Sequence, residues 1–282
     1  MKKVIVIGAN GQLGRSVRDV FDDGITFSFY SREELDIIDK ENLKQIFKSE
    51  TFDYCVNCAA YTNVEGAETN LEQAFLINAE GAKNIAEVCQ LNAVKLIHIS
   101  TDYVFNGENR VPYDANDSTN PINVYGESKL QGERYIQDQL NEHYIIRTSW
   151  LYSLHGKNFL KTIISKLEDN ISLNITTEEE GTPTSCTDLA AFIVHIIKTD
   201  KTPFGTYHFS ANGSTTWYGF AQEIAKHLNL ETTAKIKPTD GFKTLAKRPK
   251  YSVLDLKKTE DVYKKLSSWE TSVRFMVEAY KG

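Results

Sequence analysis

A hydroxyl residue, a tyrosine and a lysine near the middle of the chain have the types and spacing of a proton-donating site. Thr101 follows the apolar run Val94–Ile99, and Tyr125 and Lys129 stand four residues apart. On a helix this spacing puts both side chains on one face, where they can reach one cavity. The ammonium would lower the pKa of the Tyr125 phenol from about 10 toward neutral. Such a phenol can donate or accept a proton when a carbonyl and an alcohol interconvert.

The tyrosine–lysine pair is a weak signal by itself. The chain contains 14 tyrosines and many lysines, so about one Tyr-x-x-x-Lys match is expected by chance. The alternative is an ordinary helix surface with a half-buried tyrosine and a solvated lysine. The elements that would position the pair therefore decide between the two interpretations.

The first of these elements are a strand, a glycine-rich turn and a helix. The β-branched run Lys2–Ile7 predicts a buried parallel strand, which leads into the turn Gly8–Gly14 and a helix through about Phe21. Glycines here allow a tight bend and let the backbone approach a pyrophosphate, which the N–H groups at the helix start would bind. The alternative is a glycine-rich turn that holds no ligand.

The second predicted strand, Thr26–Tyr30, ends in Ser31 and Arg32 rather than in an acidic residue. An acid there would bind the adenosine 2′-hydroxyl and repel a 2′-phosphate, whereas Ser31 and Arg32 could accept the phosphate. We therefore predict NADP as the cofactor, or tolerance of both NADP and NAD. The alternative is that Arg32 is a solvated loop cation.

Strands and helices then alternate up to residue 150. Further strands are predicted at Asp53–Cys58, Val94–Ile99 and Tyr144–Arg147, and helices at Lys40–Ser49, Asn70–Leu91 and from near Ile122. This alternation predicts an α/β fold with a doubly wound parallel Rossmann sheet, whose ligands bind at the carboxyl ends of the strands. The glycine-rich turn and the Thr101, Tyr125 and Lys129 set lie at those ends. After the third strand, small residues such as Ala59 and Ala60 would let a cofactor lie against the backbone.

After Trp150 the pattern loosens and predicts a smaller C-terminal α/β domain. Elements are expected near 158–167, 171–175, 188–198, 206–210, 217–228 and 269–280. We place a dinucleotide-binding domain at 1–150 and a substrate-binding domain at 151–282, with a cleft between them. Arg248, in a compact basic group, could grip a diphosphate, or the group could be a solvated turn. We interpret Trp150 as a substrate contact and Trp217 as a core residue.

Composition and cysteine placement narrow the function classes. The formal charge of −6 argues against nucleic acid as a partner, and no apolar run reaches the length of a membrane span or a signal peptide. Cys55 and Cys58 lie in a predicted strand, where positions i and i+3 face opposite sides. We therefore interpret the four cysteines as apolar fillers in a reducing compartment and expect a cytoplasmic protein.

The motifs above, taken together, resemble those of the extended short-chain dehydrogenase/reductases, and within them those of the dTDP-4-dehydrorhamnose reductases. The matching segments run nearly end to end: Gly8–Gly14, Asn57–Val64, Ser100–Phe105, Asn123–Lys129, Arg147–Trp150, Gly205–Phe209 and Arg248–Asp255. The resemblance also implies that residues 186–210 return to the first domain.

The resemblance assigns roles to individual residues. It implies that Thr101, Tyr125 and Lys129 are catalytic and that Lys129 also holds the nicotinamide ribose. The expected cofactor-binding set is Gly8, Asn10, Gly11, Gln12, Leu13, Gly14, Ser31, Arg32, Asp36, Ile37, Cys58, Ala59, Ala60, Tyr61, Thr62, Ile99, Tyr125 and Lys129. The expected substrate-binding set is Val64, Thr101, Asp102, Tyr103, Trp150 and Arg248.

The activity implied by the resemblance is reduction of the C4 ketone of dTDP-4-dehydro-L-rhamnose to dTDP-L-rhamnose by hydride from NADPH or NADH, with Tyr125 as proton donor. Dehydratases of the family carry a glutamate after the Thr-Asp pair; Tyr103 stands there, which favours reduction over dehydration. Some reductases of this type are dimers joined by a metal bound just after the glycine motif. Arg15 and Ser16 occupy that region, so no metal is expected and a homodimer stays open. The alternatives are another nucleotide-sugar 4-ketoreductase or epimerase, or a non-catalytic regulatory subunit.

Overall fold

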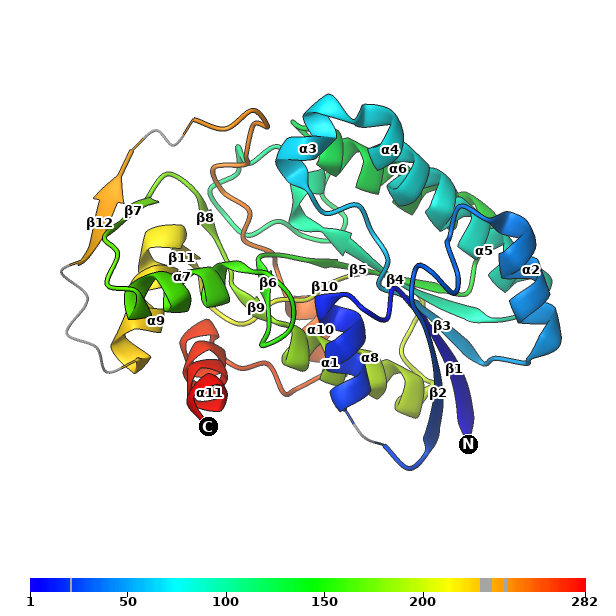
Figure 1. Cartoon of the computed structure of the whole chain (residues 1–282). Helices are drawn as coiled ribbons and strands as arrows, with labels where there is room; N and C mark the ends of the chain where they lie inside the picture. The colour runs from blue at the N-terminus through cyan, green and yellow to red at the C-terminus, as the bar shows by residue number, and fades with distance from the viewer. Residues whose placement is uncertain (21, 229–234, 241–242) are drawn as a thin grey trace.

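The centre of the molecule is a six-stranded parallel sheet with the order β10-β5-β4-β3-β1-β2 (Figure 1). Its strands are β1 (Lys2–Ile7), β2 (Ile25–Tyr30), β3 (Tyr54–Asn57), β4 (Lys95–Thr101), β5 (His143–Thr148) and β10 (Gly205–His208). The computed structural model describes residues 1–20, 22–228, 235–240 and 243–282. Phe21, the predicted end of the first helix, lies outside the described residues.

Helices cover both faces of this sheet (Figure 1). On one face α1 (Gln12–Asp19) and α8 (Cys186–Thr199) pack on Val4 and Val6, and on the other α2 (Lys40–Ser49), α5 (Gly81–Leu91) and α6 (Val124–Gln139) pack on Ile5 and Ile7. Successive residues of β1 thus enter opposite cores, which explains why the strand is apolar at each of the four buried positions from 4 to 7. The predicted doubly wound α/β fold is confirmed.

The cysteines follow the same alternation. Cys55 lies in the core of the second face, whereas Cys58 packs against the core of the first. All four cysteines are free, and burial raises the pKa of the Cys58 thiol to about 12. The interpretation of the Cys55 and Cys58 pair as separate apolar fillers is confirmed.

The segment predicted as one helix at Asn70–Leu91 is more complex. It begins earlier with α3 (Val64–Thr69), and α4 (Leu71–Phe75) joins α5 through one π-helical turn, η1 (Leu76–Glu80). In that turn the Asn78 amide accepts a hydrogen bond from the Tyr61 N–H at 2.8 Å and donates to its carbonyl at 3.1 Å. The same amide donates to the Ser128 hydroxyl at 2.9 Å. The π-turn therefore connects the loop after β3 to α6 through tertiary hydrogen bonds. The helical spacing of apolar residues cannot indicate such bonds.

The C-terminal part supplies a second layer of short elements around a third core. Its helices are α7 (Phe159–Glu168), α9 (Trp217–His227) and α11 (Trp269–Lys281), whereas α10 (Lys257–Val262) contacts β10 and packs Val262 against the first core of the main sheet. Its strands form two-stranded pairs: β6 (Leu151–Tyr152) with β9 (Thr184–Ser185), β7 (Leu173–Thr176) with β12 (Ile236–Thr239), and β8 (Glu180–Gly181) with β11 (Thr215–Thr216). Residues 186–210 leave this layer to form α8 and the edge strand β10 of the main sheet.

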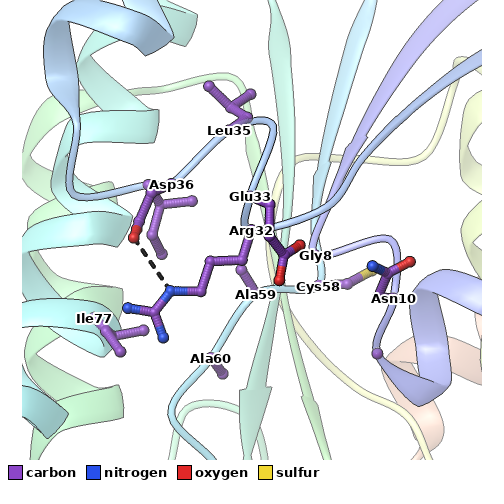
Figure 2. A pocket seen from close by; sticks show the side chains of 12 residues that line it. Gly8, Asn10, Arg32, Glu33, Leu35, Asp36, Cys58, Ala59, Ala60 and Ile77 are labelled. Atoms are coloured by element: carbon purple, nitrogen blue, oxygen red, sulfur yellow. Dashed lines mark hydrogen bonds and ion pairs between the residues drawn. The ribbon is translucent and has the colours of Figure 1, made fainter.

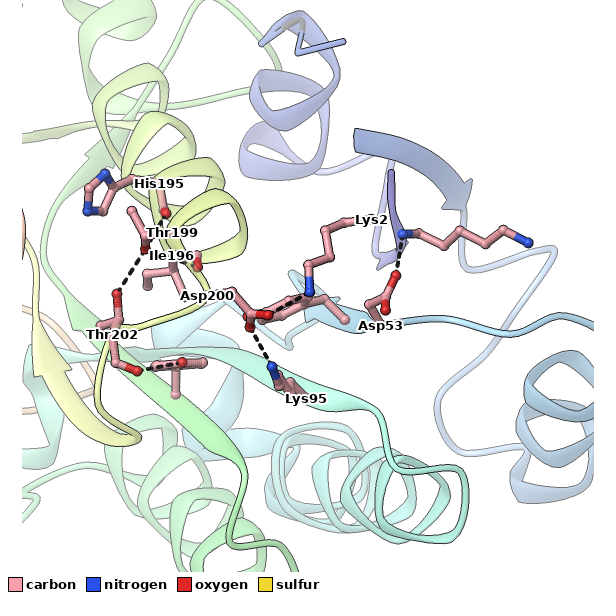
Figure 3. A network of polar contacts seen from close by, with 11 residues as sticks. Lys2, Asp53, Lys95, His195, Ile196, Thr199, Asp200 and Thr202 are labelled. Atoms are coloured by element: carbon pink, nitrogen blue, oxygen red, sulfur yellow. Dashed lines mark hydrogen bonds and ion pairs between the residues drawn. The ribbon is translucent and has the colours of Figure 1, made fainter. Parts of the chain in front are cut away.

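An ionic cluster fixes α8 to the amino-terminal end of the sheet (Figure 3). Asp200, just after α8, accepts hydrogen bonds from Lys2 Nζ at 2.6 Å, from the Tyr54 hydroxyl at 2.5 Å, and from Lys95 Nζ. Burial alone would raise the pKa of the Asp200 carboxyl, but these three donors outweigh it and hold the pKa well below its usual range. The cluster lies at the end of the sheet away from the cavities described below.

Within the described residues, no helix is long and apolar enough to cross a membrane. No cluster of three or more His, Cys, Asp or Glu side chains in the described part of the chain could hold a metal ion.

Candidate active site

Thr101, Tyr125 and Lys129 line one cavity of about 630 Å³ at the carboxyl ends of the strands. Thr101 is the last residue of β4, and the other two lie on the first two turns of α6. The side chain of Asn123 caps that helix by accepting the Gly126 N–H at 2.8 Å. The structure thus brings together the three residues that the sequence analysis predicted to be catalytic.

Gly126 permits the close approach that sets Tyr125 beside Thr101. A Cβ atom at residue 126 would lie 2.1 Å from the carbonyl oxygen of Tyr103, in the single turn η2 (Asp102–Val104) after β4. Only a residue without a side chain lets α6 begin against this turn. The rings of Tyr103 and Tyr125 then pack edge to face, with centroids 5.9 Å apart and an interplanar angle of 76°.

The phenol of Tyr125 has a raised pKa, not a lowered one. Burial raises the pKa of Tyr125 to about 12; the nearby Thr101 hydroxyl lowers it and the Asp102 carboxyl raises it. The predicted shift toward neutral is therefore wrong for the protein on its own. The reason is that the Lys129 side chain does not hydrogen-bond the phenol and that desolvation of the buried phenolate dominates.

Lys129 instead binds to β4. Its Nζ donates to the carbonyl oxygen of Ile99 at 2.7 Å and lies 3.2 Å from Nε2 of His98. The side chain is 1% exposed, and burial lowers the pKa of Lys129 to about 8, against a smaller raising effect of Glu133. Lys129 is thus held at the wall of the cavity by groups of the neighbouring strand.

The glycine-rich turn forms a backbone cradle at one end of this cavity. Gly8 has φ +82°, and a Cβ there would lie 2.6 Å from the Ala59 nitrogen. Gly11 stands at the start of α1, where no described side chain caps the helix, and Gly11, Gln12 and Leu13 line the cavity. An uncapped helix start beside a glycine turn fits a pyrophosphate. These residues therefore fit a dinucleotide.

A second cavity of about 210 Å³ continues from the same turn (Figure 2). Asn10, Gly11, Cys58 and Ala60 line both cavities. The far wall of the smaller one carries Arg32, whose Nε lies 3.2 Å from the Asp36 carboxylate, together with Ile37 and the carboxylate of Glu33. Its size and its contact with the cradle fit the adenosine half of a dinucleotide.

The acid Glu33 was missed by the sequence analysis, which described the tip of β2 as free of acidic residues. Ser31, predicted beside Arg32 as a phosphate contact, is buried, and its backbone N–H donates to Glu34 at 2.7 Å. Of the predicted pair Ser31 and Arg32, Arg32 is the one that lines this cavity. Glu33 had a sequence signal, since it directly follows Arg32.

Unpaired polar atoms gather at the other end of the large cavity. Asp102 Oδ2, Arg248 Nε and the Thr148 hydroxyl are buried without a hydrogen-bond partner in the described residues. Burial raises the pKa of the Asp102 carboxyl to about 7. Buried polar atoms without partners are costly, so this end of the cavity suits a polar ligand with both donors and acceptors. Glu65 orients Arg248 by accepting from Nη2 at 3.0 Å.

Two stacked tryptophans form part of the wall of the same cavity. Trp150 and Trp217 stack with ring centroids 3.7 Å apart and an interplanar angle of 8°. Trp217 Nε1 donates to Glu179 at 2.7 Å. Trp217 packs against the third core, as predicted, but it also lines the cavity, which the core interpretation did not foresee.

The other predicted residues divide into two groups. The two cavities are lined by Gly8, Asn10, Gly11, Gln12, Leu13, Arg32, Asp36, Ile37, Cys58, Ala59, Ala60, Thr62, Val64, Ile99, Asp102, Tyr103, Trp150 and Arg248. Three predicted residues do not line either: Gly14, Ser31 and Tyr61. A Cβ on Gly14 would lie 2.6 Å from the Gly8 carbonyl, so this glycine serves helix–strand packing, and the Tyr61 ring packs against the second core.

Comparison with known proteins assigns this arrangement to a family. The model of the RmlD substrate binding domain matches residues 1–281. The chain belongs to the RmlD family. It is 33% identical over 98% of its length to the dTDP-4-dehydrorhamnose reductase of Sinorhizobium fredii, of which it covers 97%. It is 35% identical to the spore coat polysaccharide biosynthesis protein SpsK of Bacillus subtilis, over 97% of this chain and 96% of that protein.

A solved structure shares the whole fold of this chain. The dTDP-4-dehydrorhamnose reductase of Bacillus anthracis, crystallised in complex with NADP, superimposes with a TM-score of 0.94 at 34% identity, covering 99% of each chain.

Proposed function

We propose that this chain reduces the C4 ketone of dTDP-4-dehydro-L-rhamnose to dTDP-L-rhamnose with NADPH, and accepts NADH less well. The observation that carries the proposal is the large cavity itself. It joins the glycine cradle to Thr101, Tyr125 and Lys129, and it ends in the unpaired atoms of Asp102 and Arg248. The names of the RmlD-family relatives support the choice of substrate.

In this proposal NADPH, when bound along the cradle, supplies the hydride that reduces the ketone. The chain supplies the proton: Oη of Tyr125 donates it to the developing alkoxide at C4. Burial keeps that phenol protonated at neutral pH, the state from which an acid must donate. The Thr101 hydroxyl, which donates to Asp102 at 3.0 Å in the structure, would turn to hydrogen-bond the same oxygen as charge develops.

Lys129 would stabilise the phenolate left on Tyr125 and hold the nicotinamide ribose. At the adenosine end Arg32 would contact the 2′-phosphate of NADP. Glu33 beside it could bind the adenosine 2′-hydroxyl of NAD, the weaker cofactor. At the other end Arg248 would grip the diphosphate of the nucleotide sugar and Trp150 would contact the substrate. Residues 1–150 with 186–210 then form the cofactor domain, and the remaining residues up to 282 form the substrate domain.

The wider setting of the proposal is a cytoplasmic enzyme whose partner is a small nucleotide sugar. Four free cysteines support a reducing compartment. A homodimer stays the alternative to a monomer, and sedimentation velocity separates the two.

The test is a direct incubation of the protein with dTDP-4-dehydro-L-rhamnose and each nicotinamide, followed by NMR of the product sugar. We expect NADPH absorbance to fall with formation of dTDP-L-rhamnose. An epimerase would leave NADPH unconsumed, and a product with the opposite C4 configuration, such as a 6-deoxy-talose, would assign another 4-ketoreductase. No turnover of any keto-sugar, together with a stable protein partner, would contradict the proposal in favour of a regulatory subunit.

A further inference from the structure

A buried chain of hydrogen bonds runs from the backbone after β3 to the side chain of Lys129. The N–H of Ala59 donates to Oδ1 of Asn57 at 3.0 Å, and Nδ2 of Asn57 lies 3.0 Å from Nδ1 of His98. On the other side of the ring, Nε2 of His98 lies 3.2 Å from Nζ of Lys129, which also donates to the Ile99 carbonyl at 2.7 Å. Asn57, His98 and Lys129 are each 1% exposed, so water does not complete these contacts.

The backbone fixes the direction of every bond in this chain. A peptide N–H can only donate, so the Asn57 atom that faces Ala59 must be the carbonyl oxygen. The amide nitrogen therefore faces Nδ1 of His98 and donates to it. A ring nitrogen that accepts carries no proton, so the proton of the neutral imidazole is on Nε2.

The neutral state of His98 follows from its surroundings. Burial, the largest influence, lowers the pKa of His98 well below its usual range. A doubly protonated ring would also set an N–H against the amide nitrogen of Asn57. The His98 ring is therefore the neutral Nε2–H tautomer.

This tautomer points an N–H at the amine of Lys129. An ammonium has three donors and no lone pair, so a charged Lys129 would meet Nε2–H as donor against donor. A neutral amine has a lone pair that accepts this bond while one of its own hydrogens binds the Ile99 carbonyl. All donors in the chain find acceptors only when Lys129 is neutral.

The charged groups around Lys129 do not reverse this preference. Glu133 on α6 favours the ammonium, but its carboxylate is already held by Arg147 on β5, through Nη2 at 2.7 Å and Nε at 3.0 Å, and by the Ser100 hydroxyl. Burial is the largest influence on the pKa of Lys129 and lowers it. His143 on β5 acts on His98, whose pKa it lowers further.

We propose that His98 is a positioning residue for Lys129. Asn57 holds His98 as the Nε2–H tautomer, and this tautomer stabilises the neutral Lys129 amine beside the Ile99 carbonyl. The protonated ammonium turns away from this position toward Tyr125 and the cavity. The proposal rests on the proposed role of Lys129 in ketone reduction. When Lys129 takes a proton from solvent in the cavity that it lines, the ammonium can no longer accept from Nε2–H of His98 and moves toward the phenol. Its charge then stabilises the phenolate that remains after Tyr125 has given its own proton to the alkoxide.

The first test reads the His98 tautomer in the unaltered free protein by NMR with ¹⁵N-labelled histidine, assigning the ring through its contact to Lys129. We expect a protonated Nε2 and an unprotonated Nδ1 with no titration near neutral pH. A protonated Nδ1 would overturn the proposal. This reading requires no variant, so it stands even if a substituted chain does not fold.

The second test follows the titration of Lys129 by ¹³Cε NMR, with its signal assigned by loss in Lys129→Met. In His98→Gln the amide can rotate and offer its oxygen to the ammonium, so the Lys129 midpoint should rise by about one pH unit. His143→Gln, which alters a nearby histidine outside the chain of bonds, should leave the midpoint in place. An unchanged midpoint in His98→Gln, or an equal rise in both variants, would overturn the proposal.

Both tests use the free protein and no keto-sugar, so their failure is distinct from a failure of the proposed reduction. If reduction itself fails, the tautomer and the Lys129 midpoint are unaffected. If reduction proceeds and the tautomer is Nδ1–H, only the role of His98 is lost.

Discussion

Replacing Tyr125 by phenylalanine removes one oxygen and leaves the rest of the site in place. The ring of residue 125 still packs against Tyr103, and the cradle for the dinucleotide is untouched. A positioned general acid contributes about 10²- to 10⁴-fold to turnover. That factor corresponds to about 3–5 kcal/mol of activation free energy. We therefore expect kcat of Tyr125→Phe to fall by about 10²- to 10⁴-fold while the Kd for NADPH changes far less, because the glycine cradle is retained.

The assay measures NADPH consumption at saturating keto-sugar, with NADPH binding followed separately by fluorescence titration. Tyr152→Phe is the matched control, because it makes the same change at a buried tyrosine outside the cavity. The Tyr152 hydroxyl is fully buried and has no partner among the described residues, so its loss should leave kcat unchanged and raise the free energy of unfolding by about 1 kcal/mol. A near-normal kcat in Tyr125→Phe would refute the assignment of the proton donor.

Three further changes test other parts of the structure. Arg32→Ala should raise the KM for NADPH about tenfold and barely alter that for NADH, since only NADPH carries the 2′-phosphate; equal effects in steady-state kinetics would contradict this contact. Asp200→Asn should lower the free energy of unfolding at pH 7 in urea titrations. Because the folded pKa of Asp200 is depressed, this loss should shrink as the pH falls below about 4, and a pH-independent loss would contradict the ionic cluster. Gly126→Ala should reduce kcat with folding retained by circular dichroism, because its Cβ would lie 2.1 Å from the Tyr103 carbonyl and α6 must shift; unchanged kcat would show that this approach is not needed.

Local patterns predicted most of the sheet because its strands carry their own signal. The buried part of Lys2–Ile7, from Val4 onward, is continuously apolar, and so is Tyr54–Asn57 up to its last residue, as is typical of strands buried on both faces. The glycine turn could also be predicted, because glycines at this spacing directly after a strand are typical of a turn that binds a dinucleotide. The π-turn at Leu76–Glu80 could not be predicted from the local pattern, because it accompanies hydrogen bonds between Asn78 and Tyr61, which lie 17 residues apart in the chain.

The site was predicted in its residues but not in its electrostatics. Helical spacing placed Tyr125 and Lys129 on one wall, but it said nothing of the His98 ring and the Ile99 carbonyl that hold the lysine amine. Those groups come from a strand that lies about 30 residues earlier in the chain. The position of the Lys129 amine relative to Tyr125 is therefore set by β4 and not by the spacing of the two residues on α6 alone.

The most direct measurement of the central claim follows the transferred hydrogen. The protein is incubated with dTDP-4-dehydro-L-rhamnose and NADPH deuterated on the transferring face of nicotinamide C4, and the product is examined by proton and deuterium NMR. The account predicts one deuterium, at C4 of the product dTDP-L-rhamnose, for each NADPH oxidised. Deuterium at another carbon, or a product without deuterium, would contradict it.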